Sequence, residues 1–286
     1  MYYQANFFRL LILSILLLLG CQQAGSEGEP IKTTLDFTSP GPRAQQLIAN
    51  DGFENYFSQL SLADMRLQLD LSDTAWIDTS IYKDLLRQMP MAWPYELVEK
   101  LQPLWFQVLR ESEAIFPGIL PDTIHLILTD DQPYGSHVYF TRNMAVIMPQ
   151  TALQHSTKRE LLHTFRHELF HLISRNHLDW RPILYAMANF QPISDEQLIW
   201  PDQLTEKCLS NPDAANHGYA LIHDGKKYLP ILFRPDILVG NSGDGSFFSE
   251  NIRYAFYKLS EDLEITEEQL LDWKVKEAAK ANSHYF

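Results

Sequence analysis

Hydrophobic residues recur at helical spacing between Leu47 and Phe116, which predicts a mainly helical stretch that ends in one long amphipathic helix. The apolar run at residues 123–128 predicts a strand, and runs at 138–140 and 144–148 predict two shorter strand pieces. Residues 157–174, 182–190 and 249–281 are expected to be helical, and residues 191–247 mostly irregular. This order of elements predicts an α+β fold in one compact domain with two lobes.

The N-terminal apolar run, residues 10–19, contains no charged residue and follows a single base, Arg9. A helix of ten residues rises only about 15 Å, which is about half the hydrocarbon core of a bilayer. The run is therefore too short for a stable membrane span. Residues 1–20 instead have the short basic segment and the apolar segment of a secretory signal peptide.

The signal peptide ends in Leu18-Leu19-Gly20-Cys21, which resembles the lipobox of bacterial lipoproteins. The resemblance implies cleavage before Cys21, lipidation of Cys21 and a place in the bacterial cell envelope. Because Gln22 rather than Asp follows the cysteine, it also implies the outer membrane. Residues 21–45, rich in Gly, Pro, Ser and Thr, are expected to be the lipidated cysteine and a flexible tether, and residues 46–286 the folded domain.

The charge balance of the chain excludes one class of partner. The sequence has 23 Lys and Arg against 36 Asp and Glu, a formal net charge of −13. Such an acidic domain repels phosphate backbones, so we expect no nucleic-acid partner. Contact with the membrane is expected through the N-terminal lipid. Since Cys208 is the one cysteine besides Cys21, no internal disulfide is expected.

The strongest chemical signal is His167-Glu168-Leu169-Phe170-His171, inside the helix that the capping box Thr157-Lys158-Arg159-Glu160 opens. Two histidines four residues apart on a helix lie one turn apart on the same side, so both imidazoles face one space. They would supply two neutral nitrogen ligands to Zn²⁺, and Glu168 would reach a water molecule beside the ion.

At these residues the chain resembles the zincin metallopeptidases. The resemblance implies a zincin-like fold: a small mixed sheet, an active-site helix and a helical C-terminal lobe. It makes His167 and His171 zinc ligands and Glu168 the general base that activates water to hydrolyse a peptide bond. The implied protein is a lipid-anchored zinc peptidase, a hydrolase acting on peptides or proteins.

Two residues compete for the third zinc ligand. His177 fits the metzincin spacing, but Ser174 stands where that family has the glycine that turns the chain back. Glu250 fits the gluzincin pattern, in which the ligand is a Glu on a separate later helix, here the stretch 247–256. We favour Glu250; Glu196 is a more distant candidate.

Residues 167–190 and 211–214 also resemble a group of uncharacterised bacterial proteins with a gluzincin-like site. In that group the helix after a glycine loop carries a Glu that matches Glu250. The group often has an acid four residues further on, where this chain has Tyr254. A tyrosine can still donate a hydrogen bond to a metal ligand.

Other candidate parts and functions follow from the same pattern. In zincins an edge strand above the helix pairs with the substrate, and residues 137–149 suit that role. Tyr219 and His223 are candidates to stabilise the oxyanion. The alternative is a non-catalytic envelope lipoprotein that binds a partner, with a degenerate or structural metal site. Hydrolysis of amides in cell-wall peptides is a third possibility.

Overall fold

The computed structural model describes residues 31–50, 52, 55–72, 74–211, 213, 218–234 and 251–269. The predicted signal peptide (1–20), Cys21 and Glu250 lie outside these residues. The chain has the predicted mixture of helices and sheets, which confirms the α+β class. Within the described part, no helix combines the length and the apolarity needed to cross a bilayer.

The first sheet has three parallel strands and an antiparallel edge. Its strands are β1 (Thr34–Phe37), β2 (Pro90–Met91), β3 (Thr123–Thr129), β4 (Phe140–Arg142) and β5 (Ala145–Pro149). The order is β1-β3-β5-β4, with β2 pairing antiparallel to the end of β3. β1 and β5 run parallel to β3, whereas β4 pairs antiparallel with β5. The predicted strands at 123–128 and 144–148 are thus confirmed.

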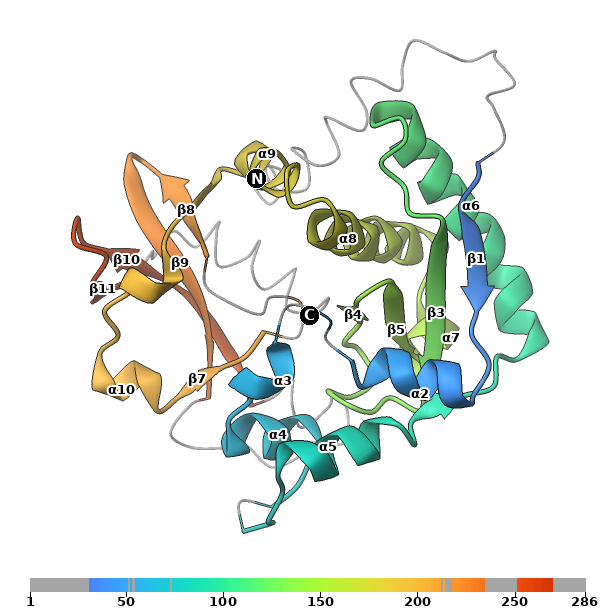
Figure 1. Ribbon diagram of the computed structural model, residues 1–286, viewed down its shortest axis with the longest axis horizontal. Helices are drawn as coiled ribbons and strands as arrows, with labels where there is room; N and C mark the ends of the chain where they lie inside the picture. Colours follow the sequence, from blue (N-terminus) through green and yellow to red (C-terminus); the bar gives the residue numbers. More distant parts are fainter. Residues whose placement is uncertain are drawn as a thin grey trace.

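Helices cover both faces of this sheet (Figure 1). On one face lie α6 (Tyr95–Ile115), α7 (Gln150–His155) and α8 (Lys158–Asn176). Trp105 of α6 stacks on Phe165 of α8 with ring centroids 4.4 Å apart, and both are fully buried. On the other face are α2 (Pro42–Ile48), α3 (Tyr56–Gln59), α4 (Leu62–Gln68) and α5 (Thr79–Leu86). Because helices cover both faces, β3 and β5 are buried at nearly every position, and β5 is apolar throughout.

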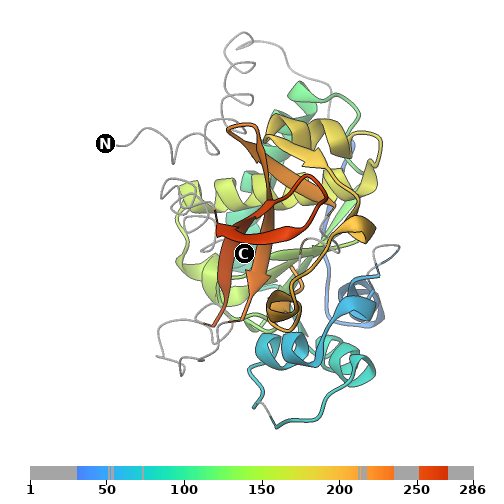
Figure 2. The same cartoon turned by 90° about the vertical axis from the view of Figure 1, so that its left-hand side faces the viewer.

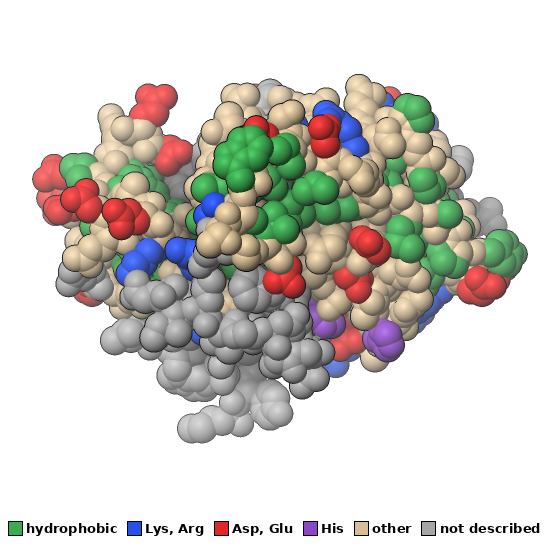
Figure 3. Space-filling model, turned by 90° about the horizontal axis from the view of Figure 1, so that it is seen from below, with side chains coloured by type: hydrophobic (Ala, Val, Ile, Leu, Met, Phe, Trp, Pro, Cys, Tyr) green, Lys and Arg blue, Asp and Glu red, His purple; other side chains and the backbone are tan. Residues whose placement is uncertain are grey.

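The second sheet is antiparallel and faces the viewer in Figure 2. Its strands are β6 (Phe190–Pro192), β7 (Cys208–Leu209), β8 (Tyr219–His223), β9 (Lys226–Phe233), β10 (Arg253–Leu259) and β11 (Ile265–Gln269). They are ordered β11-β10-β9-β8-β6, with β7 paired to β9. The short helices α9 (Arg181–Met187), η2 (Asp195–Gln197) and α10 (Asp202–Thr205) connect α8 to this sheet. Acidic side chains gather at this end of the molecule (Figure 3).

The predicted helix at residues 249–281 is wrong where the structure describes it. Residues 253–259 form β10, and 265–269 form β11, so the described part of the C-terminal lobe is a sheet rather than a group of helices. In β10, Tyr254 and Phe256 face one cluster while Ala255, Tyr257 and Leu259 face another. A segment that is apolar on both faces has no distinguishing period, so its sequence fits a buried helix or a strand equally well. Residues 191–247, expected to be irregular, likewise supply β6 to β9.

The predicted tether extends too far along the chain. Residues 34–37 pair with β3 as an edge strand, with Thr34 opposite Thr123 and Phe37 opposite Leu126. Pro42 then begins α2, whose Ala44 is fully buried. The folded part therefore includes residues that the Gly- and Pro-rich composition assigned to a linker. Composition missed them because this strand is held by pairing with a segment about ninety positions away.

The capping box at the start of α8 is present. Thr157 Oγ1 accepts a hydrogen bond from Glu160 N, and Glu160 Oε2 accepts one from Thr157 N, at 3.3 and 2.8 Å. The helix extends to Asn176, and burial of its apolar side stabilises it along this length.

Replacing the cap, Thr157→Ala, should lower the free energy of unfolding by about 1 kcal/mol, because the amide of Glu160 loses its acceptor. Urea titration followed by circular dichroism measures the loss. Thr157→Ser keeps the hydroxyl and should unfold close to wild type; equal losses in both variants would contradict a capping role.

Candidate metal centre

The two histidines of the motif meet on α8. His167 Nε2 and His171 Nε2 are 2.9 Å apart, and their rings are inclined at 83°. Two nitrogen ligands about 2.0–2.1 Å from one tetrahedral zinc ion lie about 3.3 Å apart, so a small rotation of either ring brings the pair to that spacing. The helix thus directs both nitrogens to one point, as predicted.

Both histidines are held in the neutral form that a metal requires. Burial and, to a smaller extent, the neighbouring His171 lower the pKa of His167 to about 3, against a weaker opposing effect of Asp213. Burial also lowers the pKa of His171. A neutral imidazole keeps a lone pair for a metal ion, so neither ring has to lose a proton at neutral pH before binding.

Glu168, which follows His167 directly, is fully buried, and neither of its carboxylate oxygens has a hydrogen-bond partner among the residues that the structure describes. Burial raises the pKa of Glu168 well above its usual value, the charge of Asp213 raises it further, and Arg175 partly offsets both. A buried carboxylate without hydrogen-bond partners lowers the stability of the fold, so its presence indicates a functional role. Glu168 and His171 both feel the charges of Asp213 and Arg175, so a buried acid with no described hydrogen-bond partner shares the polar surroundings of the histidines, which fits a site that receives a cation.

Three further residues complete the polar centre, and sequence reasoning did not assign them a role. Asp213 Oδ1 accepts hydrogen bonds from Thr141 N (2.8 Å) and Thr141 Oγ1 (2.9 Å). Arg175 Nη1 donates to Thr141 O at 2.6 Å and also bonds Thr141 Oγ1, and its Nη2 lies 3.9 Å from Asp213 Oδ1. Burial acts to raise the pKa of Asp213, but His171, Arg175 and the Thr141 amide together hold it below its usual value.

The position of Arg175 was accessible from sequence, whereas that of Asp213 was not. Glu168, His171 and Arg175 follow one another at spacings of three and four, so they lie along one side of α8. Asp213 reaches the same side from the chain after β7, 72 residues beyond Thr141, its hydrogen-bond partner. A contact of that separation leaves no periodic signal in a single sequence.

Strand β4 lies at the edge of the first sheet, where a zincin substrate would be expected to pair. The N–H of Thr141 already donates to Asp213, and its C=O already accepts from Arg175. A peptide added as a strand at this point would have to displace both side chains. The edge expected for substrate is thus occupied at its centre.

The candidates for a third ligand lie apart from the pair or outside the described residues. His177 ends α8, and its Nε2 is 2.8 Å from Ile119 O. Glu196 is exposed in η2. Among the residues the structure describes, no group of three His, Cys, Asp or Glu side chains could hold a metal ion. The helix expected to carry Glu250 is absent from residues 251–269, but Glu250 itself lies outside the described part.

The two oxyanion candidates occupy opposite ends of β8. Tyr219 stacks on Tyr185 with ring centroids 4.2 Å apart. The centroid of the Phe170 ring lies 5.6 Å from that of Tyr185 and 5.9 Å from that of His171. A row of rings therefore connects Tyr219 to the histidine pair. His223 lies four residues further along, with its Nε2 3.5 Å from Asp224.

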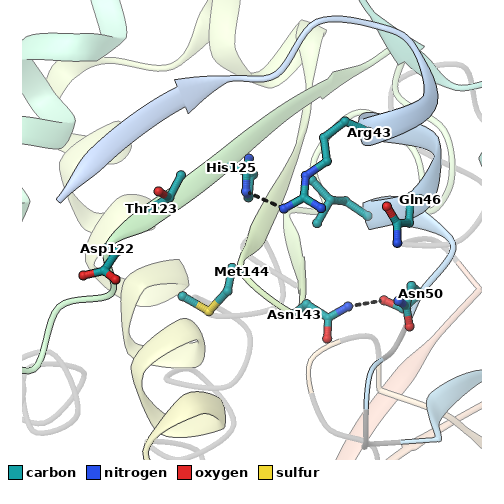
Figure 4. A pocket seen from close by; sticks show the side chains of 9 residues that line it. Arg43, Gln46, Asn50, Asp122, Thr123, His125, Asn143 and Met144 are labelled. Atoms are coloured by element: carbon teal, nitrogen blue, oxygen red, sulfur yellow. Dashed lines mark hydrogen bonds between the residues drawn. The ribbon is translucent and has the colours of Figure 1, made fainter.

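A separate cavity of about 540 Å³ lies on the opposite face of the first sheet, beside α2 (Figure 4). Arg43 Nη2 donates to His125 Nε2 at 3.1 Å, while His125 Nδ1 is 2.8 Å from Asp36. Across the cavity Asn143 donates to Asn50 O (2.8 Å), and Asp122 adds a negative charge to the lining. These bonds join α2 to the strands, and the cavity is remote from the histidine pair.

Comparison with known proteins found no matching family model, no similar curated protein and no similar solved structure.

Removing the buried charge should stabilise the protein in a pH-dependent way. In the presence of a chelator, the stability difference between Glu168→Gln and wild type should be smallest at about pH 4.5, where Glu168 is protonated in the folded state and about half protonated in the unfolded state. As pH rises, the unfolded wild type releases this proton first, because the folded pKa is raised. Wild type therefore loses stability relative to the variant until pH passes the folded pKa.

Urea unfolding of both proteins between pH 4.5 and 8 measures this difference. Glu196→Gln, at an exposed acid, is the matched control and should show no such trend. A constant difference between wild type and Glu168→Gln across this range would contradict the buried, partnerless state of Glu168.

Proposed function

We propose that this chain is a lipid-anchored, zinc-dependent peptidase of zincin type, held at the outer membrane of a bacterial envelope through Cys21. The observation that carries the proposal is the pair of neutral histidine nitrogens 2.9 Å apart beside the buried carboxylate of Glu168. The mixed sheet with an antiparallel edge strand, and α8 packed beneath it, also supports the zincin comparison.

The predicted site residues have different roles in this proposal. His167 and His171 would hold zinc, and Glu250 stays the predicted third ligand. Zinc, when bound, lowers the pKa of water and polarises a carbonyl group. Glu168 takes the proton from the water that attacks the scissile carbonyl, and passes it to the leaving amine. The raised pKa of Glu168 favours the protonated carboxyl, the form from which this side chain passes a proton to the leaving amine.

One observation favours the alternative, a non-catalytic lipoprotein that binds a partner. Both backbone groups of Thr141 on the β4 edge are bonded to Asp213 and Arg175. A site closed to an extended peptide in this way suits a structural metal centre that joins the chain after β7 to α8. A measurement of hydrolysis, on proteins and on cell-wall peptides, distinguishes the peptidase from this non-catalytic alternative.

Zinc content tests the ligand set. Purified protein dialysed against buffered zinc should hold about one ion, as expected for a catalytic zinc site. His167→Ala and His171→Ala should lose it, and Glu250→Ala should lose it too if the gluzincin assignment is right. His177→Ala should retain zinc because its ring bonds Ile119 O. Loss in His177→Ala with retention in Glu250→Ala would favour the metzincin arrangement instead.

Glu168→Gln separates the two functions. A peptidase should keep its zinc and lose activity on an unstructured protein such as casein by about 10²-fold or more, the scale of general-base catalysis. The readouts are zinc content and release of new amino termini. Wild-type protein that binds zinc but releases none, from casein or from cell-wall peptides, would favour the partner-binding alternative.

Asp213→Asn should weaken zinc binding by about 10- to 100-fold, the usual cost of losing a charged group that supports metal ligands. The side chain keeps its size and an acceptor for Thr141, but loses the negative charge that acts on His167 and His171. Asp179→Asn, at an exposed acid just after α8, is the control. Competition with a zinc-binding dye measures both; equal affinities in the two variants would remove Asp213 from the site.

A further inference from the structure

Three exposed apolar side chains gather where α8 turns into α9. Leu178, Trp180 and Ile183 are 55%, 42% and 56% exposed, and we call them the α9 patch. Trp180 is the N-cap of α9, and Ile183 follows three residues later, so both lie on one side of its first turn. Single exposed apolar residues are ordinary, but three within six positions are typical of a surface that meets something apolar.

The patch lies at the end of the molecule where β1 begins. The Trp180 ring packs edge-on against Phe116 with centroids 6.0 Å apart, and His177 bonds the carbonyl of Ile119. Phe116 and Ile119 belong to the connection from α6 to β3. Figure 1 shows α9 on the same side as the upper end of α6, and the α4–α5 region on the opposite side.

The first strand enters at this same end. Thr34 N donates to the carbonyl of Asp122, in the same α6–β3 connection, and Thr34 then pairs beside Thr123. Ile31, where the described chain begins, packs in the cluster that includes Phe116. The chain therefore enters the fold close to the α9 patch.

The distance from this entry point to the predicted lipid is short. Ile31 stands ten positions after Cys21, and even a fully extended chain over that interval spans only about 34 Å. A lipid on Cys21 would thus keep this end of the molecule within about 34 Å of the bilayer surface. Any apolar side chains at the same end would be held at a high local concentration of lipid.

We propose that the α9 patch lies on the bilayer that carries the Cys21 lipid; this rests on the proposed lipid anchoring, and not on peptidase activity. Tryptophan favours the interface between headgroups and acyl chains, and Leu178 and Ile183 add apolar area beside it. Because Asp179 and Arg181 give the stretch 178–183 one charge of each sign, and the chain as a whole is acidic, the surface it fits is a zwitterionic phospholipid rather than an anionic one.

Tryptophan quenching tests the contact. The full chain, purified with its lipid, is reconstituted in phosphatidylcholine vesicles with or without bromine on the acyl chains. Brominated lipid should quench part of the wild-type emission, and Trp180→Phe should lose most of that quenching. Trp76→Phe is the matched control: Trp76 is 73% exposed between α4 and α5, on the opposite side, and its loss should leave the quenching unchanged.

Each other outcome overturns the proposal. Undiminished quenching in Trp180→Phe, or loss in Trp76→Phe instead, would place a different face on the membrane. Absence of quenching in wild type, with a dimer by light scattering that Trp180→Ser converts to monomer, would assign the patch to a second copy of the chain. Mass spectrometry checks the anchor separately: a purified chain without lipid at Cys21 would overturn the anchoring and this proposal together, and leave the zinc experiments unaffected.

Discussion

Two buried arginines meet at one backbone carbonyl, and the arrangement of the whole centre depends on that meeting. Arg142 and Arg175 both donate to Thr141 O, at 2.8 and 2.6 Å, while Asp213 accepts from the amide of the same residue. Burying charge is costly unless every charge finds a partner of suitable geometry. Here the partners come from β4, from α8 and from the chain after β7, so none of the three can shift without exposing the others' charges. The position of the histidine pair relative to the sheet is thereby fixed.

Arg142 extends this constraint into the N-terminal helices. Its guanidinium lies 3.9 Å from the centre of the Tyr56 ring and 5.0 Å from that of Phe140. The hydroxyls of Tyr56 and Tyr134 are 2.7 Å apart, and Gln68 of α4 donates to Tyr56. Aromatic faces and hydroxyls thus solvate the cation in place of water. Helices α3 and α4, which carry none of the zincin motif, are therefore bound to the same polar centre as α8.

The parts that sequence predicted are those with local signals. The capping box and the apolar periodicity gave α8, and the spacing of His167 and His171 gave their convergence, because a helix determines its own geometry. Residues 253–259 carry apolar side chains toward both faces of a sheet, so no period separated strand from helix. β1 and Asp213 were missed for a shared reason: each is placed by partners about seventy to ninety residues away. A ligand on the stretch 247–256 was inferred from a helix that the described residues replace with a strand.

The edge position of β1 has a mechanical consequence. Because β1 runs parallel to β3 and enters the sheet at its own N-terminal end, a pull on the chain before Ile31 acts along the strand axis. The hydrogen bonds between Thr34–Phe37 and β3 would then be loaded together in shear, rather than opened one after another as in a zipper. A protein dragged by its N-terminus would resist unravelling at the strand most exposed to that force.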